Sequence, residues 1–265
     1  MAFLKTTIRK CNFIIIAVLF SGLVGCSNNP KQAENTVPKL NSLTETEISE
    51  GWMLLFDGES FNGWRGLGRD DVPEAHWVIE DGSIRKVESG IIPVQADGQP
   101  VGGGDLMTKE TFSNYEFTFE WKISEAGNSG IKYNVSEEMS IWNGSPHALG
   151  FEYQVLDDEN HPDNVNPTHL AASLYDMITP EDAVLKPVGE FNTGRILFNG
   201  NHCEHWLNGV KVVEFDLETE HFDSLFQKSK YTNHPDFPEK RSGHIVLQDH
   251  SDDVWYKNLK IRKLK

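Results

Sequence analysis

The feature that most constrains the fold is a strict alternation of aromatic and polar side chains over residues 112–123. Three aromatic residues alternate with four polar ones: Phe117, Phe119 and Trp121, against Glu116, Thr118, Glu120 and Lys122. A period of two places alternate side chains on opposite faces of a β-strand. The segment therefore predicts a long strand with one buried face and one polar face.

Shorter strand patterns fill most of the chain after residue 50, with turn signals every 8–12 residues. Asn208-Gly209 separates two of these patterns and Asp81-Gly82 separates two others, and both dipeptides are strong hairpin signals. Heptads, internal repeats and long helical patterns do not occur. These features predict an all-β fold, a sandwich or jelly roll.

The first residues have the order of a secretory leader. Lys5, Arg9 and Lys10 precede a short apolar run over 13–19 that is too brief to span a bilayer, and Leu23-Val24-Gly25-Cys26 has the lipobox pattern of a bacterial lipoprotein. This order predicts a lipoprotein signal peptide over 1–25 and lipidation of Cys26. Acyl chains on Cys26 would hold the protein on a membrane without a transmembrane helix, which predicts a lipid-anchored protein of the cell envelope.

The polar segment after Cys26 has no apolar period, so residues 26–46 are predicted to be the acylated cysteine and a flexible tether. Residues 47–265 are then long enough for one jelly-roll domain with a full core.

Charge and cysteine usage exclude several classes of function. Removal of the leader takes away three of 24 basic residues and none of the 40 acidic ones, so the mature charge is 21 − 40 = −19. Such a charge argues against a nucleic-acid partner, whose binding needs basic patches. Cys11 is removed with the leader and the thiol of Cys26 is taken up by lipidation, so Cys203 has no partner for an intramolecular disulfide and a buried structural thiol is expected.

A second alternating strand, over residues 150–158, has polar groups on one face. Phe151, Tyr153 and Val155 point one way, and Glu152, Gln154 and Leu156 point the other. An acid and an amide on a strand need partners or a water-filled cleft if they are buried. The polar face is therefore either an exposed sheet face or the floor of a sugar-sized groove.

The same strand bears on the choice of reaction. Retaining glycosidases on lectin-like jelly rolls place Glu-x-Asp-x-x-Glu on one strand, and here that spacing reads Glu152-x-Gln154-x-x-Asp157. Direct displacement needs two carboxylates about 5 Å apart, and the central carboxylate is an amide in this chain. A conventional endoglycanase of that type is therefore disfavoured.

Other polar residues have the strand parity or loop position to converge on the groove. Residues 160–190 lack a strand pattern, and a segment of that length inside a compact domain is typical of a functional loop. Trp142 and Trp206 are candidates for stacking on a sugar face. The remaining candidates come from neighbouring strands, the last strand pair and the loop: Glu120, Lys132, Gln248, His250, His161, Tyr175 and Lys186.

Ordered sequence blocks from residue 54 to the C-terminus carry a family resemblance. They include Leu54-Leu55-Phe56-Asp57-Gly58, Asn128-Ser129-Gly130-Ile131, the strand from Glu152 to Asp157, Lys186-Pro187-Val188-Gly189-Glu190, and Gly243 to His250. The chain resembles the 3-keto-disaccharide hydrolase family, also known as domain of unknown function 1080. That resemblance implies a concanavalin-like jelly-roll β-sandwich with long loops over its concave face. Phe191 stands where Trp is usual, and Ser251 where Gly usually follows the Gln-Asp-His block.

The resemblance implies cleavage of glycosides that are oxidised at C3. Such a reaction can run by C2 proton abstraction and β-elimination with hydration, and it needs one base, one enolate stabiliser and one acid. His250 or Glu152 is the candidate base, Lys186 or a divalent cation the stabiliser, and Tyr175 or His161 the acid. The candidate substrate-binding residues are Glu120, Lys132, Gln154, Trp142, Trp206 and Gln248.

The sequence leaves open whether a metal ion binds and whether the protein is an enzyme. Four residues offer a mixed oxygen and nitrogen ligand set for calcium, manganese or zinc: Glu120, Glu152, Asp157 and His250. The alternative function is a non-catalytic glycan-binding surface lipoprotein, because a jelly-roll fold alone does not imply catalysis.

Overall fold

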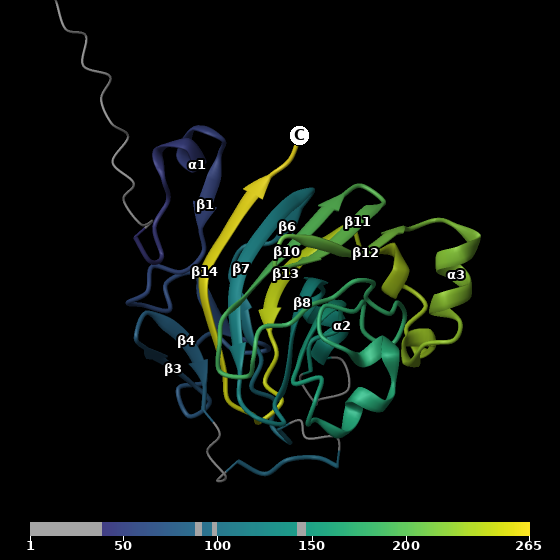
Figure 1. Cartoon of the computed structure of the whole chain (residues 1–265), viewed down its shortest axis with the longest axis horizontal. Coiled ribbons are helices and arrows are strands. Elements are labelled where there is room, and N and C mark those ends of the chain that lie inside the picture. The colour runs from purple at the N-terminus through teal and green to yellow at the C-terminus, as the bar shows by residue number, and fades with distance from the viewer. Residues whose placement is uncertain (1–38, 88–91, 97–99, 142–146) are drawn as a thin grey trace, which may run out of the picture. The chain divides into compact units, whose positions relative to one another are not determined.

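The computed structural model describes residues 39–87, 92–96, 100–141 and 147–265 (Figure 1). The predicted leader, Cys26 and Trp142 lie outside the described residues. Within these ranges, none of the helices has the length and apolar character needed to cross a membrane.

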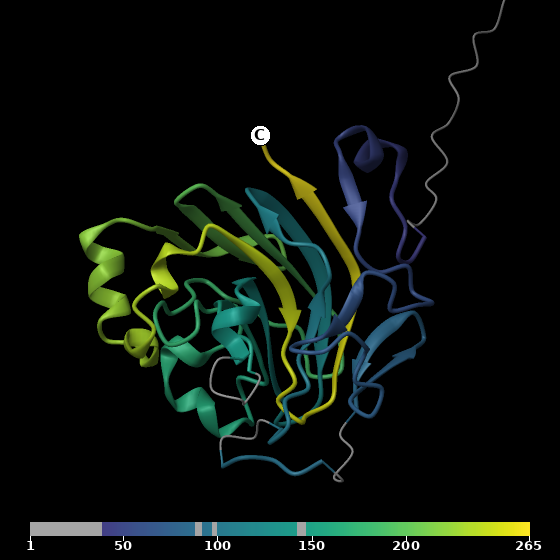
Figure 2. The ribbon, with the colours of Figure 1, turned by 180° about the vertical axis from the view of Figure 1, so that it is seen from behind.

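Two antiparallel sheets pack face to face (Figures 1 and 2). Sheet A has eight strands in the order β12-β11-β10-β7-β14-β4-β3, with β1 beside β14. Its strands are β1 (Trp52–Leu54), β3 (Trp77–Glu80), β4 (Ser83–Lys86), β7 (Tyr115–Ile123), β10 (Asn192–Asn199), β11 (His202–Leu207), β12 (Val210–Asp216) and β14 (Val254–Lys263).

Sheet B has six strands in the order β2-β5-β13-β8-β9, with β6 beside β13. Its strands are β2 (Trp64–Gly66), β5 (Leu106–Thr108), β6 (Phe112–Ser113), β8 (Asn128–Val135), β9 (Phe151–Leu156) and β13 (Ser242–Leu247). This two-sheet architecture confirms the predicted sandwich.

Helices are few and short. The α-helices are α1 (Glu45–Ser49), α2 (Glu137–Ile141) and α3 (Glu220–Phe226), and the 3₁₀ turns are η1 (Pro162–Val165), η2 (Pro167–His169), η3 (Lys230–Asn233) and η4 (Phe237–Glu239). Ordered contacts begin before residue 47, because Asn41 and Asn258 each donate a backbone N–H to the other's side-chain oxygen at 2.8 Å. The folded domain therefore includes part of the segment that was predicted to be a tether.

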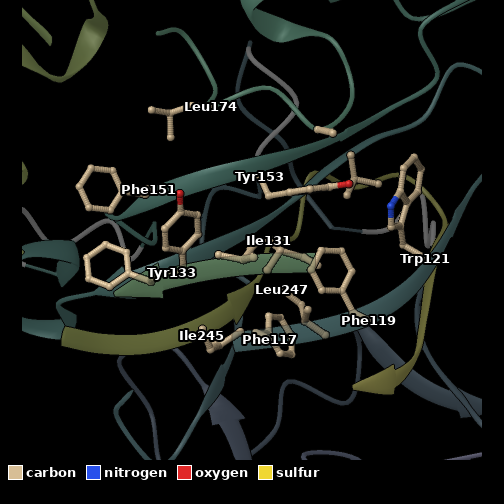
Figure 3. Packing of buried hydrophobic residues seen from close by; sticks show 14 of the residues in the cluster. Phe117, Phe119, Trp121, Ile131, Tyr133, Phe151, Tyr153, Leu174, Ile245 and Leu247 are labelled. Atoms are coloured by element: carbon tan, nitrogen blue, oxygen red, sulfur yellow. The ribbon is translucent and has the colours of Figure 1, made fainter. Parts of the chain in front are cut away.

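The core lies between the sheets and has the aromatic face of β7 at its centre (Figure 3). Phe117, Phe119 and Trp121 are all buried, which confirms the alternation predicted from the sequence. Phe119 packs edge-to-face against Tyr153 of β9, with ring centroids 5.1 Å apart. Aromatic contacts of this kind add to the free energy gained from burial alone.

The two predicted hairpin turns are confirmed by their backbone angles. Asp81 and Gly82, between β3 and β4, have φ of 48° and 69°. Asn208 and Gly209, between β11 and β12, have φ of 49° and 85°. Two successive positive φ angles define the type I′ turn that matches the twist of an antiparallel pair.

Phe117→Ala is expected to lower the free energy of unfolding by about 3–5 kcal/mol, because it removes a fully buried ring and leaves a cavity. Urea denaturation of the purified domain measures this change. Thr118→Ala, the next residue on the polar face of β7, is the matched control and is expected to change stability by about 0.5 kcal/mol or less. Equal losses in the two variants would contradict the assignment of faces.

Candidate active site

The polar face of β9 is buried, although it points away from the core between the sheets. Glu152 is 3 % exposed and Gln154 is 1 % exposed, whereas Phe151, Tyr153 and Val155 fill the core side of the same strand. Loop residues cover the polar face, so it is the floor of a cavity. The exposed-face interpretation of this strand is therefore wrong.

A cavity of about 650 Å³ lies over this face of sheet B, a size typical of small-ligand sites. Strands β8 and β9, the residues after β13, the long loop after β9 and the start of η3 all contribute to its walls. Six residues proposed from the sequence line this one cavity: Glu152, Gln154, His161, Tyr175, Gln248 and His250.

Gly130 on β8 makes room for the carboxylate of Glu152. Gln154 is the register partner of Gly130 on β9, and the backbone N–H of Gln248 donates to Gly130 O at 2.9 Å from the other side. A Cβ atom on Gly130 would lie 2.3 Å from Glu152 Oε1. The carboxylate therefore occupies the space that a side chain at position 130 would fill, between the two glutamine positions.

Lys132 on β8 lies opposite Glu152 on β9 in the strand register, and its side chain contacts the Glu152 carboxylate. Its Nζ is 3.6 Å from Glu152 Oε2 and donates to Ala148 O at 3.0 Å. Lys132 is 6 % exposed and is not part of the cavity wall. This position makes it a partner of the carboxylate, whereas the sequence analysis expected it to bind substrate.

A cluster of charged and aromatic side chains holds Tyr175 in the cavity wall. Its hydroxyl donates to Asp163 Oδ2 at 3.2 Å, and its ring stacks on His169 with centroids 4.2 Å apart. His169 in turn lies 2.8 Å from Asp163 Oδ1 and 3.2 Å from Asp176 Oδ1. Burial raises the pKa of Tyr175, and the nearby Glu152 and Asp163 charges raise it further, so its hydroxyl keeps its proton.

Lys230, at the start of η3, is a cavity residue that the sequence analysis missed. Its backbone N–H donates to Asp176 Oδ2 at 2.6 Å, and its Nζ lies 4.2 Å from the centre of the Tyr175 ring. Burial of the ammonium lowers the pKa of Lys230, while the Glu152 charge opposes that shift. It lies in a polar loop without periodicity, so no pattern in the sequence marked it.

Two histidines enter the cavity from different segments. His161 caps η1, with Nδ1 accepting from the Asp163 backbone N–H at 3.1 Å, so its neutral ring carries hydrogen on Nε2. His250 follows Asp249, a fully buried carboxylate that lies 2.5 Å from His76 Nδ1 and 3.2 Å from Lys86 Nζ. These two contacts of Asp249 anchor the turn that carries His250.

Ser251 has a φ of 75°, in the left-handed region that glycine adopts most easily. The position where the family usually has Gly thus has the backbone conformation that favours Gly. The Ser251 backbone N–H donates to Asp249 Oδ1 at 2.9 Å, which helps to hold this conformation.

Four of the proposed residues lie elsewhere. Glu120 and Trp206 line a separate cavity on the outer face of sheet A, where Glu120 accepts from Asn258 Nδ2 at 2.7 Å. Lys186 and Asp157 line a third cavity, where Lys186 Nζ donates to Phe191 O at 2.6 Å. Alternation identifies the face of a strand but does not identify the sheet that it joins, which is why parity misplaced Glu120. Trp206 was proposed as an aromatic residue that could stack on a sugar, and residue type alone does not place it.

The four residues proposed as metal ligands are consequently not gathered at one point. Asp157 uses its oxygens to accept backbone N–H groups, including that of Ala126 at 2.8 Å, and so serves as a turn cap. In the described part of the chain, one group of three side chains brings ligand atoms within 4.8 Å of one another: His202, Glu204 and Glu214. That group lies on β11 and β12 of sheet A, away from the cavity over sheet B.

A jelly-roll sandwich with a cavity of this size, lined by carboxylate, amide and imidazole groups, defines the class of β-sandwich proteins that bind small polar ligands. Within that class, the chain belongs to the family of 3-keto-alpha-glucoside-1,2-lyase-like domains, whose sequence model matches residues 51–262. The match covers most of both sheets and every described residue named above as a cavity residue.

Individual relatives agree with this assignment. The chain is 36 % identical over 294 aligned positions to the 3-keto-disaccharide hydrolase of Bacteroides thetaiotaomicron, covering 97 % of this chain and 99 % of that one. A predicted glycosyl hydrolase of Parabacteroides distasonis has a crystal structure that superposes with a TM-score of 0.75 at 32 % identity, over 86 % of this chain and all of that one. A second such protein of that organism superposes with a TM-score of 0.57 at 26 % identity, over 80 % and 99 %.

Proposed function

We propose that the protein is a carbohydrate-active enzyme that cleaves the glycosidic bond of 3-keto-glycosides, including 3-keto-disaccharides. The observation that carries this proposal is the convergence of a buried carboxylate, an ammonium and an imidazole on one cavity. Two comparisons support the proposed activity: the membership of the chain in its family, and its similarity to the 3-keto-disaccharide hydrolase of Bacteroides thetaiotaomicron.

The proposed reaction is an elimination followed by hydration. A ketone at C3 acidifies the proton on C2, and a base removes that proton to form an enolate. The enolate electrons then form the C1–C2 double bond as the C1–O bond breaks, and an acid protonates the leaving oxygen. Water adds across the double bond, so the net change is hydrolysis. This route needs one base and one acid, so the amide at Gln154 does not block it.

We assign the base to Glu152 and the enolate stabiliser to Lys230. Glu152 lies on the cavity floor, with the Lys132 ammonium 3.6 Å from its carboxylate and the cavity on its other side. Lys230 is the lysine in the cavity wall, and it takes the role that the sequence analysis gave to Lys186 or a cation. A positive charge beside the C3 oxygen stabilises the negative charge of the enolate.

His161 is the better of the two candidate acids. Its Nε2–H is the donor that the ring has left, because Nδ1 accepts from the Asp163 backbone, whereas the Tyr175 hydroxyl already donates to Asp163. Tyr175 instead orients the Lys230 ammonium through its ring face. His250 remains a second candidate for the base, because it lines the same cavity.

We also propose that the enzyme is located at the cell envelope. The basic start, the apolar run and Cys26 have the order of a lipoprotein leader. A lipid on Cys26 would hold the folded domain at a membrane surface where oligosaccharides pass.

The test is release of the aglycone from a 3-keto-β-glucoside and from its unoxidised parent by purified protein. Release from the keto-sugar alone is the expected result, because the parent has no acidic C2 proton. Release that stops with EDTA would add a divalent cation to the mechanism. Binding of both sugars in calorimetry with release from neither would replace the enzyme by a glycan-binding lipoprotein, and release from the parent would indicate a conventional glycosidase.

A further inference from the structure

Two buried amide oxygens in the cavity have no hydrogen-bond partner in the described part of the chain. Gln154 is 1 % exposed and Gln248 is 5 % exposed, and both line the cavity. The Oε1 atom of each has no hydrogen-bond partner among the described residues. A buried acceptor that stays unpaired is costly, so each oxygen points to a hydrogen-bond donor on a ligand.

Neighbouring contacts fix the orientation of the Gln154 amide and the backbone position of Gln248. Gln154 Nε2 donates to Asn128 Oδ1 at 3.3 Å, and the Asn128 backbone N–H donates to Asp252 Oδ2 at 2.9 Å. The amide nitrogen of Gln154 is therefore engaged and its oxygen is the group left for a ligand. Gln248 is held through its backbone, whose carbonyl accepts from Ser129 Oγ at 2.8 Å.

The two glutamines flank the proposed base. They lie on either side of Gly130 across sheet B, and the Glu152 carboxylate leans over Gly130 between them. A sugar whose C2 hydrogen faces Glu152 therefore presents its neighbouring groups to Gln154 and Gln248.

We propose that Gln154 and Gln248 are specificity residues that accept hydrogen bonds from the two hydroxyl groups beside the C3 ketone. This inference rests on the proposed function. The C3 carbonyl oxygen is itself only an acceptor, so it cannot pair with an amide oxygen and faces the Lys230 ammonium instead. The donors next to it are the C2 and C4 hydroxyls. The substrate class is then 3-keto-glycosides with both of these hydroxyls free.

The experiment compares kcat/KM on a 3-keto-glucoside with that on its 2-deoxy and 4-deoxy analogues. Wild-type protein is expected to disfavour each analogue by about 10- to 100-fold beyond the analogue's own change in reactivity, because a buried oxygen is left unpaired. Gln154→Met and Gln248→Met keep the side-chain length but remove the acceptor. Each variant is expected to lose the discrimination against one analogue and to keep it against the other.

Gln227→Met, at the exposed end of α3, is the matched control and is expected to keep both discriminations. Thermal unfolding of all three variants shows that they are folded. Full discrimination against both analogues in both cavity variants would overturn the inference. If wild-type protein does not cleave the unmodified keto-sugar, the proposed function fails separately. The glutamines are then tested by binding alone, with calorimetry of the parent glucoside and of its 2-deoxy and 4-deoxy forms. Equal affinity of wild-type protein for all three sugars would overturn the inference.

Discussion

Glu152→Gln is expected to lower kcat on a 3-keto-glycoside by about 10²- to 10⁴-fold, the range that a positioned general base contributes. The amide keeps the size of the side chain but cannot take the C2 proton. Aglycone release under substrate saturation measures kcat, and substrate affinity is expected to change much less. Exchange of the C2 hydrogen with deuterated water, followed by NMR, is expected to fall in parallel, because that step is the one removed.

The matched control is Glu120→Gln, which removes a carboxylate from the outer face of sheet A and is expected to leave kcat within about twofold of wild type. Because Lys132 loses its carboxylate partner in Glu152→Gln, circular dichroism must show that the variant is folded. Glu152→Asp keeps the charge but withdraws it by one methylene, and an intermediate rate is expected. Wild-type activity in Glu152→Gln would transfer the role of base to His250.

The strands and the cavity floor could be predicted from the sequence because they follow local rules. Alternation identified the buried face of β7 and placed Glu152 and Gln154 together on β9. Turn dipeptides located two hairpins. These features depend on residues close together in the chain, where the geometry of a strand or a turn leaves few choices.

The rest of the site depends on long-range pairing and on loops. Lys230 reaches the cavity because Asp176, 54 residues away, binds its backbone N–H, and no local pattern encodes that contact. Asp163 and His169 were missed because they lie in a loop without periodicity, where no pattern marks the side chains that hold Tyr175. Glu120 was misplaced because its polar face belongs to sheet A, and sheet membership is decided by the order of strands in space.

The pairing of β8 with β9 predicts that the proposed reaction is sensitive to the residue at position 130. Gly130 has no side chain where Glu152 places its carboxylate, so the base and the strand beneath it are in direct contact. Lys132, two residues along the same strand, meets the other carboxylate oxygen. Strand β8 therefore sets both the position and the charge environment of the proposed base. A small substitution on this strand is expected to change the rate of the reaction directly.

Gly130→Ala is expected to lower kcat by about 10²-fold with little change in stability. The new Cβ would lie 2.3 Å from Glu152 Oε1, so the carboxylate must move by about 1 Å, and a displacement of that size is enough for such a loss. The side chain can yield because its end is flexible, which leaves the fold intact. Aglycone release and thermal unfolding measure the two effects separately.

Gly102→Ala is the matched control, because a Cβ at that position meets no atom of the described residues within 4 Å, and it is expected to keep wild-type activity. The double variant Gly130→Ala, Glu152→Gln gives the decisive comparison. If Gly130 acts only by giving room to the Glu152 carboxylate, alanine is expected to cost little further activity once that carboxylate is gone. A full additional 10²-fold loss in the double variant would mean that the space over Gly130 serves the substrate directly.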